Sequence, residues 1–114
     1  MPYIDIAVTK KLSDSVKDNL QKELSNNINV IPGKNVDNTI VAINDGISVF
    51  HKHSPQENAF FKVHLFKASP EDAKKAFASK IFEITKAVLD IPSSNVQVHF
   101  VEMDNWATGD EYMS

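Results

Sequence analysis

The residue with the clearest potential for chemistry is Pro2, the second residue of the chain. An initiator methionine is normally removed before a small residue such as proline, so we expect Pro2 to become the amino terminus with a secondary amine. An unperturbed α-amino group has a pKa of about 7.7–8.0, and an apolar pocket lowers that pKa because it disfavours the charged form. Pro2 is therefore a candidate general base near neutral pH.

The charged residues narrow the range of partners. The chain has 114 residues, 12 basic and 15 acidic, and all of the basic residues are lysines spread along the sequence. This acidic balance disfavours nucleic acid as a partner. The lack of arginine excludes a bidentate guanidinium clamp on a carboxylate or phosphate.

Two further patterns are too weak to predict a site. His51 and His53 place two imidazoles on one side of an extended segment, but no third ligand follows at a suitable spacing. The three glycines, at positions 33, 46 and 109, are too far apart to form a phosphate-binding loop. We therefore predict no metal site and no cofactor.

Hydrophobic spacing predicts the elements that must position Pro2. Apolar residues alternate over residues 2–8 and predict a strand that starts at the terminus itself. Ser13 is a candidate N-cap for an amphipathic helix, in which apolar residues recur at every fourth position (Val16, Leu20, Leu24 and Ile28). Two more strands are predicted over residues 39–43 and 47–50.

The second half of the chain starts this order again. A strand is predicted over residues 59–66, and a helix follows in which Ser69 is the cap and Pro70 the first helical residue. That helix extends to about Leu89, and a last strand is predicted over residues 96–101. The apolar residues of this second helix indicate deeper burial than in the first helix (Phe77, Phe82, Ile81, Ile84, Val88 and Leu89).

An internal repeat links the two halves. Residues 30–36 and 90–96 share Ile, Pro, Asn and Val in register, and each segment joins a helix to a strand. We predict a single α+β (α/β) domain over residues 1–114, made of two β-α-β units at about 2–44 and 59–102. Together they form a four-stranded mixed sheet with both helices on one face. Other subunits are expected to cover the second face.

In the order of its elements the whole chain resembles the tautomerase superfamily, and within it the macrophage migration inhibitory factor and phenylpyruvate tautomerase-like proteins. The residues that carry the resemblance are Met1-Pro2, Gly33-Lys34, the strand end at residues 63–66, and the segment 91–96 followed by Glu102-Met103. Their spacing agrees with that family throughout.

The resemblance implies a keto–enol tautomerase, an isomerase, acting on a 2-keto acid such as phenylpyruvate. Pro2 would be the catalytic base, Lys34 would bind the carboxylate or carbonyl oxygen, and the backbone N–H of Phe66 would contact the substrate. It also implies a homotrimer with active sites at subunit boundaries. There Gln97 and His99 would come from the neighbouring subunit, in place of the family's tyrosine and asparagine.

Departures from the family pattern limit what can be transferred. The family's Cys-x-x-Cys pair is absent, which excludes thiol-disulfide activity in this chain, and the branches that bind carboxylates through arginines are disfavoured. Glu102 aligns roughly with a water-activating glutamate of one dehalogenase branch, although a polar residue that ends a strand is the simpler interpretation. Trp106 either lines the pocket or covers a subunit edge.

A non-catalytic function remains open at this level. The order of elements also fits ferredoxin-like domains, and a cytokine-like or small-ligand binding module on the same fold is the alternative to an enzyme. The sequence contains no long apolar segment and no signal-peptide pattern, so we expect a cytoplasmic protein without membrane contact.

Overall fold

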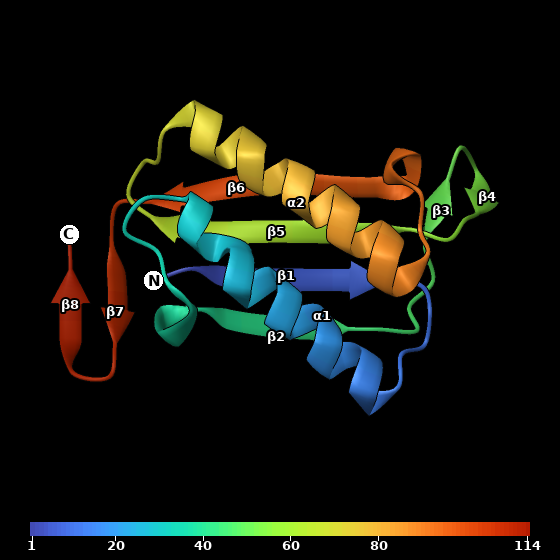
Figure 1. Cartoon of the computed structure of the whole chain (residues 1–114), viewed down its shortest axis with the longest axis horizontal. Coiled ribbons are helices and arrows are strands. Elements are labelled where there is room, and N and C mark those ends of the chain that lie inside the picture. Colours follow the sequence, from blue (N-terminus) through green and yellow to red (C-terminus); the bar gives the residue numbers. More distant parts are fainter.

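The computed structural model describes all 114 residues and contains a four-stranded sheet in the order β2-β1-β5-β6. Both helices lie on one face of this sheet (Figure 1). The sheet strands are β1 (Tyr3–Val8), β2 (Ile40–Asn44), β5 (Ala59–Phe66) and β6 (Val96–Met103), and the helices are α1 (Asp14–Asn27) and α2 (Glu71–Leu89). Short 3-10 turns occur at Ile28–Val30, Val36–Asn38 and Ser93–Asn95.

The strand directions follow the internal repeat. Within each half the two strands are parallel, β1 with β2 and β5 with β6. The halves meet where β1 pairs with β5 in the antiparallel direction. The predicted fold class, a mixed four-stranded sheet with two helices on one face, is confirmed.

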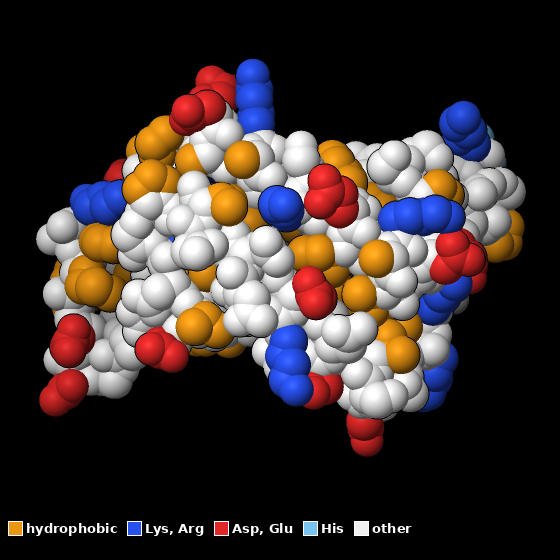
Figure 2. Space-filling view, in the orientation of Figure 1, with side chains coloured by type: hydrophobic (Ala, Val, Ile, Leu, Met, Phe, Trp, Pro, Cys, Tyr) orange, Lys and Arg blue, Asp and Glu red, His pale blue; other side chains and the backbone are white.

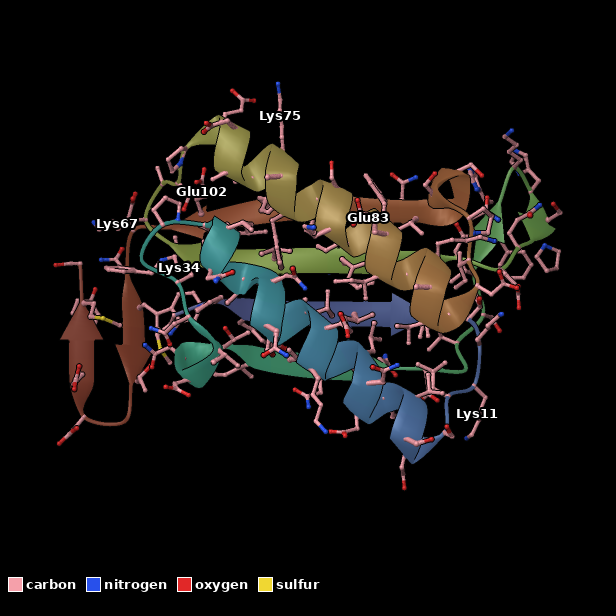
Figure 3. All side chains as sticks on the ribbon, in the orientation of Figure 1. Lys11, Lys34, Lys67, Lys75, Glu83 and Glu102 are labelled. Atoms are coloured by element: carbon pink, nitrogen blue, oxygen red, sulfur yellow. The ribbon has the colours of Figure 1, made fainter.

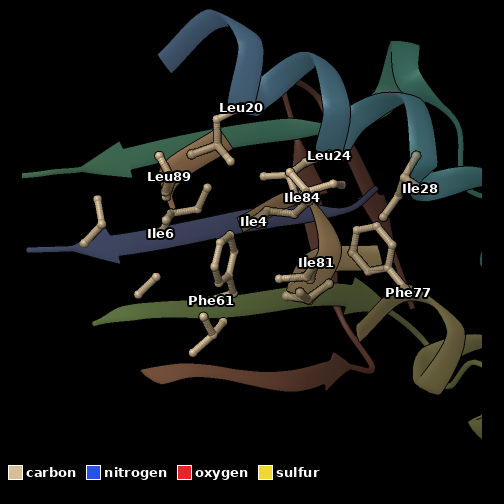
Figure 4. Close-up of a cluster of buried hydrophobic side chains, with 14 of the residues drawn as sticks. Ile4, Ile6, Leu20, Leu24, Ile28, Phe61, Phe77, Ile81, Ile84 and Leu89 are labelled. Carbon is tan, nitrogen blue, oxygen red and sulfur yellow. The ribbon is translucent and has the colours of Figure 1, made fainter. Parts of the chain in front are cut away.

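The core lies between the helices and one face of the sheet (Figure 4). Alternate residues of β1 and β5 are fully buried there, and the helices pack their apolar residues against them (Ile4, Ile6, Val8, Phe61, Val63 and Leu65 with Leu20, Leu24, Phe77 and Ile81). Burial of each such side chain stabilises the fold by about 1.5–3 kcal/mol. This packing fixes the side of each strand that faces away from the helices.

The first residues of the two helices test the capping residues predicted from the sequence. The Ser13 hydroxyl accepts from the Val16 backbone N–H at 3.2 Å, so the predicted cap of α1 is confirmed. The predicted Ser69 cap of α2 is wrong, because Pro70 occupies the N-cap position without a side-chain hydrogen bond. Ser69 instead donates its backbone N–H to the Glu102 carboxylate at 2.6 Å.

The predicted strand over residues 47–50 is wrong except at its last residue. The chain before Phe50 crosses the end of β1. There the backbone N–H groups of Gly46 and Ile47 donate hydrogen bonds to the carbonyl oxygens of Lys10 and Val8. A small hairpin follows, in which β3 (Phe50–His51) pairs with β4 (Ser54–Pro55).

A second small hairpin lies at the C-terminus and has no counterpart among the predicted elements. It consists of β7 (Trp106–Thr108) and β8 (Glu111–Met113). Figure 1 shows this hairpin beyond the end of the sheet at which the N-terminus lies.

The outer surface of the helices differs from the uncovered sheet face. On the helix side, lysine and acidic side chains are interspersed (Figure 2). The uncovered sheet face carries aromatic and apolar groups, among them Phe60 at 38% exposure and Ile40 at 50%. Neither helix has the length and apolar character that a membrane crossing requires.

Candidate active site

Pro2 lies at the edge of the core, directly before β1. It is buried, and its carbonyl accepts a hydrogen bond from the Ile40 N–H at 3.0 Å. Because β1 is flanked by β2 on one side and β5 on the other, the start of the chain is fixed near the middle of one end of the sheet. Strand pairing therefore fixes the position of an amino group at the start of β1.

Lys34 reaches the same end of the sheet from the connection after α1. Gly33 has φ +79°, a conformation that glycine adopts without steric cost, and the Lys34 N–H then bonds to the Ile31 carbonyl at 3.1 Å. The half-buried Lys34 side chain donates from Nζ to the Phe66 carbonyl at 3.2 Å. The Gly33-Lys34 pair thus brings an ammonium group to the C-terminal end of β5 (Figure 3).

The amino group of Met1 lies in this environment. Burial lowers the pKa of the Met1 amine from the ordinary value of 8.0, and the positive charge of Lys34 lowers it further. Both effects favour the neutral amine, because each penalises a second positive charge at this place. The beginning of β1 is therefore a position that favours the neutral, proton-accepting form of an amine.

Phe66 ends β5 with its side chain on the uncovered face, half-buried. Pro2, Lys34 and Phe66, which lie far apart in the sequence, therefore come together at one end of the sheet. We call this group the amine end. An ammonium group bonded to one carbonyl keeps two further N–H donors, which can bind a carboxylate.

Gln97 and His99 do not belong to the amine end of the same chain. Both are exposed on β6, where they lie beside Phe60 and Lys62 of β5, whereas Tyr3 lies beside His64. Gln97 and His99 therefore lie further along the strands than the Tyr3–His64 pair, toward the end of the sheet opposite the amine end.

A cavity occupies that opposite end. It has a volume of about 360 Å³ and is mainly apolar, with Phe50, Phe60, Ala7 and Gln97 in its lining. The His99 ring meets the Phe60 ring edge to face at a centroid distance of 5.1 Å. We call this region the cavity end, and sequence reasoning did not foresee it.

Glu102 and Trp106 have structural surroundings in this chain. Glu102 accepts from the Ser69 N–H and pairs with Lys74 Nζ at 3.1 Å. The hydrogen bond from Ser69, followed by that from Lys74, lowers the pKa of Glu102. The carboxylate therefore anchors the connection before α2, in agreement with the simpler interpretation. Trp106 is half-buried on β7 opposite Met113.

Two other groups near the site were not singled out from the sequence. Tyr3 stacks on His64 at a centroid distance of 5.2 Å, on the uncovered face. Lys67 follows β5 directly and places its Nζ 5.4 Å from the centre of the Phe66 ring.

No group of three or more histidine and acidic residues is arranged to hold a metal ion.

Comparisons with known proteins agree with this architecture. The family model described as macrophage migration inhibitory factor (MIF) matches residues 1–112. A search of curated protein sequences gives no significant match. Leishmania major MIF2 has a similar structure, with a TM-score of 0.92 and 18% identity, covering 99% of this chain and 97% of that protein.

Two further solved structures share the fold at low identity. Pt0534, described as inactivated by 2-oxo-3-pentynoate, gives a TM-score of 0.81 and 18% identity over 89% of this chain and 85% of that one. A fused 4-OT described as an asymmetric trimer gives a TM-score of 0.84 and 15% identity, over 96% and 94% of the two chains.

Proposed function

The chain belongs to the macrophage migration inhibitory factor family, and we propose that it is a keto–enol tautomerase acting on a 2-keto acid such as phenylpyruvate. The amine of Pro2 is the general base in this proposal. The observation that supports it most is the amine end itself, where Pro2 is buried and where burial and the charge of Lys34 both lower the pKa of the Met1 amine, one residue before Pro2.

Each group of the amine end has one role in the proposed proton transfer. The Pro2 nitrogen takes a proton from C3 of the keto acid, and the electron pair of the broken C–H bond forms the C2–C3 double bond. Negative charge develops on the C2 oxygen, which then receives the proton to give the enol. The Phe66 N–H and the free donors of Lys34 stabilise that oxygen and the substrate carboxylate.

A homotrimer completes the site in this proposal. The Gln97 and His99 side chains of one subunit face the amine end of the next, and the apolar cavity end supplies a wall for the substrate's side chain. Two observations support the assembly. The sheet face opposite the helices carries exposed apolar groups, and a 4-OT protein of similar fold is described as a trimer.

The choice of a 2-oxo acid as substrate has separate support. Pt0534, which has a similar fold, is described as inactivated by 2-oxo-3-pentynoate, which is itself a 2-oxo acid. The positive Lys34 ammonium at the amine end suits the carboxylate that all such acids carry.

The proposal is tested by blocking the amine. Protein with a free Pro2, verified by its intact mass, is compared with protein that keeps one additional N-terminal residue. The added residue turns the proline nitrogen into a tertiary amide without basicity, so ketonisation of enol-phenylpyruvate should fall by at least about 1,000-fold. Circular dichroism and light scattering verify that fold and assembly are unchanged.

Equal activity of the two proteins would remove Pro2 from the mechanism. If neither protein turns over the enol while both bind phenylpyruvate, the alternative holds, which is a non-catalytic cytokine-like or small-ligand binding module.

A further inference from the structure

The lysines of this chain fall into two groups. Six of the 12 have a carboxylate within 4.0 Å (Lys10, Lys17, Lys22, Lys74, Lys80 and Lys86). The other six have no such partner in the structure (Lys11, Lys34, Lys52, Lys62, Lys67 and Lys75). Of these, Lys34 and Lys67 adjoin the same residue, Phe66.

The two ammonium groups contact Phe66 at different atoms. Lys34 Nζ bonds to its carbonyl oxygen at 3.2 Å, whereas Lys67 Nζ lies over its ring, 5.4 Å from the centre. The ring attracts a cation through its negative face, so it holds the Lys67 ammonium beside Phe66, at the amine end. Figure 3 shows Lys34 and Lys67 at the same end of the molecule.

The backbone of Lys67 is in an unusual conformation. Its φ is +68°, which costs a residue with a side chain roughly 1 kcal/mol and costs glycine little. A 2.7 Å hydrogen bond from the Lys67 N–H to the Met103 carbonyl fixes this conformation. A glycine would fit the backbone here without strain, so the fold gives no structural reason for a lysine. Its side chain is the feature that requires an explanation.

We propose that Lys67 binds a second anionic group of the substrate, so that the site prefers 2-keto acids with a carboxylate at the far end. This inference rests on the proposed tautomerase function. Lys34 takes the carboxylate next to the keto group, and Lys67 takes the distal one. Because the chain has no arginine, lysine is the only side chain that carries a permanent positive charge to this position.

The test compares two substrates that differ in the presence of a distal carboxylate group. Phenylpyruvate and its para-carboxy derivative are measured as enols, and the readout is the ratio of their kcat/KM values. We expect the carboxylated acid to be preferred about two- to fivefold at low ionic strength, as for a solvent-accessible ion pair. The preference should disappear at about 1 M salt, where the Debye length is about 3 Å.

Three variants assign the preference to Lys67. Lys67→Gly keeps the backbone conformation and should bring the ratio to one by lowering kcat/KM more for the carboxylated acid. Lys67→Arg keeps the charge and should restore the preference. Lys75→Ala removes another unpaired, exposed lysine, on α2 (Figure 3), and should leave the ratio as in the parent protein.

The outcomes separate this inference from the proposed function. Turnover that depends on a free Pro2 but shows equal kcat/KM for both acids overturns the role of Lys67 and leaves the tautomerase intact. If neither acid is turned over, calorimetric binding of the two acids decides, and equal affinities, or a difference that persists in Lys67→Gly, refute the inference.

Discussion

The two ends of the sheet differ in chemistry although the same strands form both. At the amine end, burial and the positive charge of Lys34 lower the pKa of the Met1 amine, and the Lys34 ammonium group bonds to the Phe66 carbonyl. The cavity end is apolar and aromatic, and Gln97 is one of the few polar groups in its lining. One end therefore has the positive charge that the proposed reaction needs, and the other has an apolar surface suited to the hydrocarbon part of a substrate's side chain.

Under the proposed function, this difference means that one chain alone would be an incomplete catalyst. Gln97 and His99 lie beside Phe60 and Lys62 on the sheet, displaced along the strands from the Tyr3–His64 pair. In the proposed trimer, the amine end of one subunit is completed by the cavity end of another. Exposed apolar groups on the uncovered sheet face would provide a physical reason for the subunits of the proposed trimer to associate.

Separating the subunits should have the larger effect on activity. Phe60→Glu places a charge on the uncovered sheet face at the cavity end and leaves the amine end of the same chain unchanged. We expect a monomer by light scattering and a loss of kcat/KM of at least about 100-fold, because burying an unpaired carboxylate in an interface costs several kcal/mol.

The matched control is Ala76→Glu, which adds the same charge at an exposed position of α2. This variant should remain trimeric and active. A monomeric Phe60→Glu protein with full activity would show that the amine end works without a neighbour.

Removing the charge at the amine end should have the smaller effect. Lys34→Ala should lower kcat/KM for phenylpyruvate by roughly 10–100-fold, about 1.4–2.8 kcal/mol of transition-state binding, because the carboxylate loses its ammonium partner. Lys11→Ala removes an exposed positive charge at the opposite end of the molecule (Figure 3) and serves as the control. Equal kinetics for the two variants would assign Lys34 to bulk solvent.

The fold could be predicted where local pattern and tertiary packing agree. The strand over residues 59–66 has the predicted bounds, because its alternating residues are the ones that α1 and α2 cover. The strand predicted over 47–50 failed although it is apolar, because that segment crosses the end of β1 and bonds there. The C-terminal hairpin was missed because its two strands are only three residues each.

The site was harder to predict, because its parts meet only in three dimensions. Lys34 and Phe66 are 32 residues apart, and no spacing rule connects them. Their expected association came from the family resemblance rather than from the pattern of residues. The cation over the Phe66 ring and the cavity end depend on side-chain directions, which the sequence does not specify.

The most direct test of the account is the pH dependence of kcat/KM in protein with a free Pro2. With the neutral Pro2 amine as the proposed base, the rate should rise with pH through an apparent pKa below 8.0, the ordinary value for a terminal amine. In Lys34→Ala this pKa should move upward, because a positive charge that opposes protonation is gone. A limb at or above pH 8, or one that Lys34→Ala leaves in place, would contradict the assignment of Pro2 as the base.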